Sequence, residues 1–136
     1  MRKVLFLDVD GVLNHGFPTA LRPELIDRYL NWKAKHPEVE VVLASSWRIR
    51  DTWKEELRSH SINWDSETEI LSQPRGTEID QWLIKQPLRP GILYAILDDN
   101  DDFHYWQRDK HLVRTDETKG LQDHHLRQLD LILKLE

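Results

Sequence analysis

Two aspartates near the start of the chain have the spacing that phosphoryl chemistry needs. Asp8 and Asp10 are separated by one residue, and Gly11 follows them. A turn at Gly11, which has no side chain, would let both carboxylates face one pocket and let the backbone approach a ligand closely. One aspartate could then attack a phosphoryl group to form an aspartyl-phosphate. The other could protonate the leaving oxygen and later activate water.

A second acidic pair, Asp98 and Asp99, could complete a metal site with the first pair. Two carboxylates and a phosphate dianion repel one another, so this chemistry needs a bound cation. Mg²⁺ takes oxygen ligands and is usually held by one or two carboxylates together with the substrate phosphate. We therefore expect Mg²⁺ as the cofactor.

Short apolar runs precede these residues, and we interpret the runs as buried strands. Asp8 follows residues 4–7, Ser45 follows residues 39–44, and Asp98 follows residues 92–97. Continuous apolar runs of this length are typical of strands that are buried on both faces. The other expected elements are helices over 23–35, 51–58, 77–85 (with Thr77 as its cap) and 121–135, a short strand at 112–113 and a mostly irregular segment over 59–74.

The alternation of buried strands and amphipathic helices predicts an α/β fold. We expect a Rossmann-like, three-layer α/β/α domain with a largely parallel central sheet. The chain of 136 residues suits a single domain over 1–136, and no linker or repeat divides it. Right-handed crossovers bring the carboxyl ends of parallel strands to one edge of the sheet, where ligands bind. The polar residues that follow the strands should meet there.

Four motifs along the chain, in the expected order, resemble those of the haloacid dehalogenase-like (HAD) superfamily. The first is the segment LFLDVDGVLN at 5–14, and the second is Ser45 at the end of an apolar strand. The third is Arg75 ahead of a helix, where Lys is commoner in the family. The fourth is the acidic pair at 98–99. The resemblance implies a HAD-like phosphatase fold.

The end of the chain is similar to a compact branch of this superfamily that is found in RNA-repair proteins. The similar segments are HLVRTD at 111–116 and Gly120-Leu121, together with Trp47 and the Trp82-Leu83 pair. The room between the motifs holds a helix or a loop but no folded cap. We therefore expect an open site.

The resemblance implies a role for each acidic motif residue. Asp8 would be the nucleophile and a metal ligand. Asp10 would be the general acid/base and would lend its backbone carbonyl to the metal. Asp99 would ligate the metal directly, and Asp98 would support it from behind. An aspartate at position 10 goes with phosphoryl transfer in this superfamily, whereas the dehalogenases lack that acid.

The resemblance also implies how the phosphate is held. Ser45 would hydrogen-bond a phosphoryl oxygen, and Arg75 would neutralise the charge of the phosphate and the nucleophile. Ser45 could instead cap the helix that follows it, which would make Ser46 the working hydroxyl. Trp47 and Arg48, with Arg50 nearby, are candidate substrate contacts because an aromatic ring and guanidinium groups can stack a base and grip a phosphate backbone.

Composition limits the other function classes. The formal net charge of −5 argues against broad binding to nucleic acid but leaves room for a local basic patch. The chain has no cysteine, which excludes disulfides, thiolate metal sites and cysteine nucleophiles. No secretory signal and no membrane-length apolar stretch is visible, so we expect no membrane contact and a cytoplasmic location. The tryptophans expected to serve as packing residues are Trp32, Trp53, Trp64, Trp82 and Trp106.

The expected activity is therefore a Mg²⁺-dependent phosphomonoesterase with an open site. Its substrate would be a phosphorylated small molecule, such as a nucleotide, or the phosphorylated end of a nucleic acid. Two alternatives remain: a non-catalytic phosphate-binding or regulatory module, and a phosphotransferase that passes the phosphoryl group to an acceptor other than water.

Overall fold

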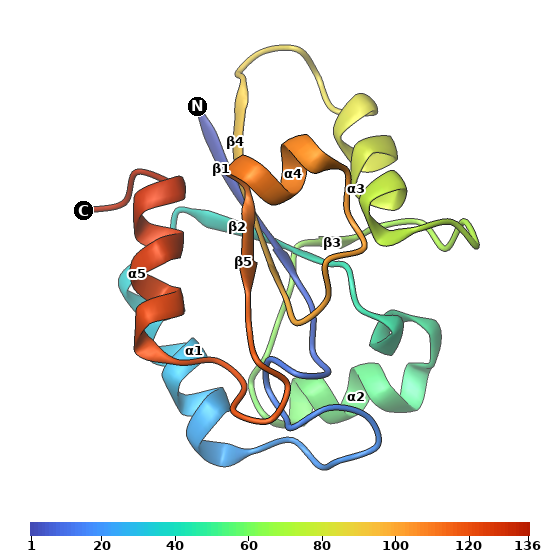
Figure 1. The fold of residues 1–136 in the computed structure, drawn as a ribbon, viewed down its shortest axis with the longest axis vertical. Helices are drawn as coiled ribbons and strands as arrows, with labels where there is room; N and C mark the ends of the chain where they lie inside the picture. The colour runs from blue at the N-terminus through green and yellow to red at the C-terminus, as the bar shows by residue number, and fades with distance from the viewer.

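The sheet at the centre of the fold is parallel throughout. The computed structural model describes all of residues 1–136. Five strands run in the order β3-β2-β1-β4-β5, and every neighbouring pair is parallel (Figure 1). Their bounds are β1 Arg2–Leu7, β2 Val39–Leu43, β3 Ser66–Glu67, β4 Ile92–Asp98 and β5 Leu112–Arg114. The predicted α/β class with a parallel central sheet is confirmed.

Helices cover both faces of this sheet (Figure 1). On one face α1 and α5 pack, and on the other lies α3, with α4 beside it. A short 3-10 helix and α2 follow the end of β2. The helices are α1 Pro23–Lys35, the 3-10 helix Ser46–Ile49, α2 Asp51–Ser59, α3 Arg75–Ile84, α4 Tyr105–Lys110 and α5 Asp123–Ile132.

β1 is the middle strand, and its alternating side chains serve two cores. Leu5 and Leu7 point into the core beneath α1 and α5, whereas Val4 and Phe6 point into the core beneath α3. All four side chains are fully buried. Burial on both faces explains why the sequence shows a continuous apolar run here rather than an alternating one. Asp8 follows the last residue of this strand, so the central strand places Asp8 at the edge of the sheet.

The start of α3 differs from the sequence prediction. The helix begins at Arg75, two residues before Thr77, and Pro74 holds the capping position with an extended backbone. Thr77 therefore lies inside the first turn, and the prediction that it caps the helix was wrong. A proline is compatible with this boundary because it cannot donate a hydrogen bond within a helix. The shift puts Arg75 on the first turn of α3.

The short elements β3 and α4 were not predicted. β3 has only two residues and pairs with the end of β2, within the segment that was expected to be irregular. α4 packs through Gln107, whose side-chain amide donates to the carbonyl of Gly76 on α3. Trp106 on α4 is 44% exposed and stacks on His104, so its predicted role as a packing residue was wrong. Its helix is too short to show an apolar stripe.

The chain inserts no folded cap over the carboxyl edge of the sheet. Only a loop joins β1 to α1, and only the 3-10 helix, α2 and β3 lie between β2 and α3. None of the helices has the length and the apolar character that crossing a membrane requires. The edge where the motif residues were expected to meet is therefore uncapped by this chain.

Candidate active site

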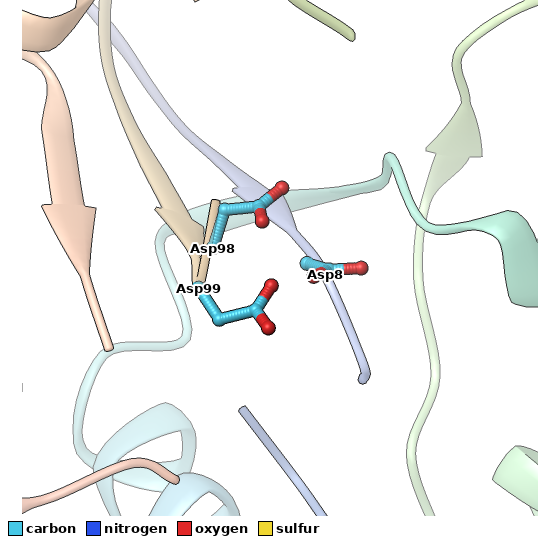
Figure 2. A group of neighbouring side chains, drawn as sticks. All are labelled: Asp8, Asp98 and Asp99. Carbon is cyan, nitrogen blue, oxygen red and sulfur yellow. The ribbon is translucent and has the colours of Figure 1, made fainter. Parts of the chain in front are cut away.

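Three carboxylates gather beyond the carboxyl ends of β1 and β4. Leu7 is in register with Leu97, so Asp8 and Asp98 follow on adjacent strands. The Asp8 amide completes the alignment by donating to the Leu97 carbonyl at 3.0 Å. Together with Asp99 these side chains present one carboxylate oxygen each, all within 4.8 Å of one another (Figure 2). Such a group of oxygens fits a hard divalent cation such as Mg²⁺.

Arg75 supplies the positive charge that this acidic cluster needs. Its Nη1 lies 3.1 Å from Asp8 Oδ1 and 3.0 Å from Asp98 Oδ2. The guanidinium reaches the carboxylates from the first turn of α3, on the far side of the site from α1. Sequence reasoning expected Arg75 to face the nucleophile, and the structure brings the two together.

Burial raises the pKa values of two carboxyl groups in the cluster, those of Asp8 and Asp99. Desolvation, and then the charge of Asp98, raise the pKa of Asp8 well above its usual value, although Arg75 opposes them. The same two causes raise the pKa of Asp99 to about 6. A cation at this point would lower the pKa values of both carboxyl groups, since it favours the charged form of each. The electrostatics of the cluster therefore fit a metal ion.

Asp10 is held by two donors on the same carboxylate oxygen. Asn14 Nδ2 donates to Asp10 Oδ1 at 2.8 Å, and the indole Nε1 of Trp47 donates to the same atom at 3.0 Å. The other oxygen, Oδ2, makes neither of these bonds. This arrangement fixes the side chain and leaves one oxygen available to exchange a proton.

Asn14 organises the whole loop that follows β1, and sequence reasoning missed it. Its buried side chain uses every hydrogen-bonding position it has. The oxygen accepts from the amides of Gly11 and Gly16, while the nitrogen donates to Asp10 and to the Thr19 carbonyl. The signal available in the sequence was its position in the first motif.

The loop also depends on Gly11 and on contacts from the end of the chain. Gly11 has a φ of +77°, and a side chain there would collide with the carboxylate of Asp99. The Thr115 hydroxyl donates to the Gly11 carbonyl at 2.7 Å, and the Leu121 amide donates to the Val12 carbonyl at 2.9 Å. The two segments that resembled the RNA-repair branch thus hold the first motif in place.

The two serines after β2 occupy different surroundings. Ser45 is fully buried, and its Oγ accepts from the Trp47 amide, so it caps the 3-10 helix. Ser46 lines an acidic cavity of about 260 Å³, which Asp8, Asp10 and Arg75 also line. Ser46 is therefore the hydroxyl-bearing residue that faces the carboxylates.

Arg48 is not placed to contact a substrate, which corrects the expectation from the sequence. Its guanidinium pairs with Glu78 at 2.8 Å and donates to the carbonyls of Ser45 and Thr68. The side chain is only 3% exposed. The sequence could not show this because Glu78 lies on α3, far along the chain. Trp47 is also buried, but its indole does reach the site through Asp10.

The parallel sheet, the acidic cluster at its edge and the basic residue on α3 together define a HAD-like domain. A family profile described as the HAD domain in Swiss Army Knife RNA repair proteins matches residues 4–126, and the chain belongs to this family. HAD domains are enzymes of the hydrolase and phosphatase kind, and they generally use Mg²⁺. Comparison with curated proteins and with solved structures finds no match.

Proposed function

We propose that the protein is a Mg²⁺-dependent phosphomonoesterase that works through an aspartyl-phosphate on Asp8. The observation that carries the proposal is the convergence of Asp8, Asp98 and Asp99 on one point, with Arg75 bridging two of them. A phosphate dianion and carboxylates can share such a site only when cations balance their charge. Family membership supports the same chemistry.

The residues that would hold the metal ion are Asp8, Asp98 and Asp99, with the backbone carbonyl of Asp10. When bound, Mg²⁺ would neutralise the charge of the phosphate and polarise its oxygens. Arg75 would bind a phosphoryl oxygen while it holds the nucleophile, and Ser46 would donate a hydrogen bond to another. Ser45 acts in this scheme by capping the helix that places Ser46 and Trp47.

The reaction would take two displacements at phosphorus. In the first, an Asp8 carboxylate oxygen forms a bond to phosphorus, the bond to the ester oxygen breaks, and Asp10 gives that oxygen a proton. In the second, Asp10 takes a proton from water, the water oxygen bonds to phosphorus, and the bond to Asp8 breaks to release phosphate. Oδ2 of Asp10 would carry the proton because Oδ1 already accepts from Asn14 and Trp47.

The substrate class follows from the uncapped edge of the sheet. A site without a lid admits a phosphate at the end of something large, such as a nucleic-acid strand, as well as a small phosphate ester or nucleotide. The description of the family as a domain of RNA repair proteins favours nucleic-acid ends. The net charge of −5 makes contact limited to the strand end more favourable than binding along a backbone.

The test is phosphate release from a panel of monoesters, with Mg²⁺ or with EDTA, for the wild type and Asp8→Asn. The panel contains p-nitrophenyl phosphate, nucleotides, and oligonucleotides phosphorylated at the 3′ or the 5′ end. We expect Mg²⁺-dependent release that Asp8→Asn abolishes. The control is Asp101→Asn, because Asp101 is an exposed neighbouring acid outside the cavity.

Two results would change the proposal. Release that persists in Asp8→Asn would rule out the aspartyl-phosphate. Phosphate binding without release from any ester would favour the non-catalytic module, unless added alcohol acceptors became phosphorylated, which would identify a phosphotransferase.

A further inference from the structure

A second cavity, of about 570 Å³, opens directly beside the acidic one. Its walls come from the loop after β1, from the 3-10 helix and from α2, and they include Phe17, Trp47, Ile49, Arg50 and Trp53. Asp10 and Ser46 line both cavities. The larger cavity is therefore a continuation of the proposed active site past the general acid. We call it the aromatic cavity.

The aromatic cavity has large apolar side chains on its wall, and two of them are exposed. Phe17 is 73% exposed and Ile49 is 54% exposed. The rings of Trp47 and Trp53 lie 6.1 Å apart, and the guanidinium of Arg50 lies 4.8 Å from the centre of the Trp53 ring. Binding sites for small organic ligands are typically concave, are lined by apolar and aromatic side chains, and have volumes of about 300–1,000 Å³.

The position of Asp10 indicates which part of a substrate would enter the aromatic cavity. A general acid must lie within hydrogen-bond reach of the oxygen that it protonates. Asp10 is held on the shared wall by Trp47, whose ring also lines the aromatic cavity. With the phosphoryl group over Asp8 in the acidic cavity, the ester oxygen lies at Asp10. The group attached to that oxygen then continues into the aromatic cavity.

We propose that the aromatic cavity binds the leaving group of the phosphate ester and selects a planar, uncharged ring in that group. This inference rests on the proposed phosphomonoesterase function. Flat rings gain most from the faces and edges of Phe17 and Trp53, and Arg50 adds a stacking partner. Asp10 and Glu56 place negative charge on the wall and Arg50 places positive charge there, so the charges largely offset one another and an uncharged ring fits best. Both an aryl group and a nucleobase have the required chemistry.

The first experiment compares esters that differ in the ring but have leaving groups of similar acidity. Benzyl phosphate is paired with butyl phosphate, and nucleoside 5′-monophosphates are paired with ribose 5-phosphate. We expect the ring-bearing ester to have a KM lower by about tenfold in at least one pair, which corresponds to about 1.4 kcal/mol of binding. The kcat values should differ little because the ring binds equally in the ground state and the transition state.

The second experiment removes the ring contacts from two exposed positions. Phe17→Ala and Ile49→Ala should raise the KM of the preferred ring-bearing ester several-fold and that of its ringless partner by less, because the ringless group makes fewer contacts with these side chains. Their matched controls are Tyr105→Ala and Ile84→Ala, since both side chains are 72% exposed but lie outside the cavity. Calorimetric titration of Asp8→Asn with benzyl and butyl phosphate measures the same preference without turnover.

The outcomes separate this inference from the proposed function. Turnover with equal KM values in both pairs, or a preference that neither variant reduces, would overturn the ring site and leave the phosphatase intact. Absence of turnover with these esters and with the phosphorylated oligonucleotides would overturn the phosphatase, and the titrations would still decide whether a ring binds. A preference in the nucleotide pair assigns the ring to a nucleobase. A preference in the benzyl pair alone assigns it to another aromatic alcohol.

Discussion

The buried amide of Asn14 is one of the two donors that fix the position of the proposed general acid, and Trp47 is the other. The Asn14 nitrogen holds Asp10, and its oxygen gathers the amides of Gly11 and Gly16 into the same loop. Only glutamine has the same two donors and two acceptor positions, and its side chain is one methylene longer. An aspartate at this position would lack the two donors, and a leucine would lack both the donors and the acceptors. The acid is thus positioned by a residue that has no chemistry of its own.

Asn14→Ala should damage both stability and catalysis. We expect the free energy of unfolding to fall by about 1–3 kcal/mol, because the backbone amides of Gly11 and Gly16 lose the oxygen that accepts their hydrogen bonds. The kcat should fall by about tenfold or more, because a displaced Asp10 loses part of the effect of general acid/base catalysis. Denaturant unfolding and steady-state kinetics measure the two, with exposed Asn31→Ala as the control. An unchanged kcat at saturating substrate would contradict the positioning role.

Arg48 and Glu78 illustrate a residue pair whose role is structural. The pair joins the 3-10 helix to α3, and both side chains are almost fully buried. Removing one partner leaves the other as an unpaired buried charge, which destabilises a protein by about 3–5 kcal/mol. We expect Arg48→Met and Glu78→Gln each to lower the free energy of unfolding, and the double variant to lose less than their sum. Additive losses in chemical denaturation would show that the two do not interact.

At the scale of elements, the turn after β1 depends on the absence of a side chain at position 11. Gly11→Ala would force a Cβ into the carboxylate of Asp99 at a backbone φ of +77°. We expect this variant to fold less stably and to bind Mg²⁺ more weakly, because Asp99 must move away from Asp8. Metal titration followed by calorimetry measures the change, and Gly91→Ala is the control, since a Cβ there meets only the end of the Met1 side chain. Unchanged Mg²⁺ affinity would contradict the expected coupling.

The elements that the sequence revealed are those whose burial leaves an apolar run or a helical stripe. The core residues of β1, β2 and β4 form such runs, so these strands and the polar residues at their ends were predictable. β3 has two half-buried residues and α4 is a short helix held by a glutamine, so neither leaves a periodic pattern. The contacts of Arg48 and Asn14 depend on which segments meet in space. Local sequence contains no record of such contacts.

For the whole molecule, the raised carboxylate pKa values couple folding to pH. The pKa of Asp99 is about 6 in the folded chain, above its value of about 3.9 in an unfolded one. Between these values the folded state binds more protons than the unfolded state, so the metal-free protein loses stability as the pH rises from about 4 to about 6. Burial and Asp98 shift Asp8 in the same direction.

The measurement is the free energy of unfolding in EDTA as a function of pH, for the wild type and for Asp99→Asn. The value for the variant is subtracted from that for the wild type at each pH. The difference should fall as the pH rises through this interval, because the asparagine does not titrate. Mg²⁺ should raise the Tm of the wild type more at pH 7 than at pH 5, since its ligands bind as carboxylates. A difference that is flat with pH, or equal stabilisation by Mg²⁺ at both pH values, would contradict this coupling.

The bridge from Arg75 to Asp8 and Asp98 has one more consequence for the whole molecule. The Arg75 guanidinium gives the site a positive charge that belongs to the chain itself and that offsets the repulsion between the carboxylates. Many metal proteins assemble their ligands only as the metal binds. We expect this site instead to bind the metal without a slow rearrangement. The rate of phosphate release should therefore follow magnesium concentration along a simple saturation curve, with no lag after the metal is added.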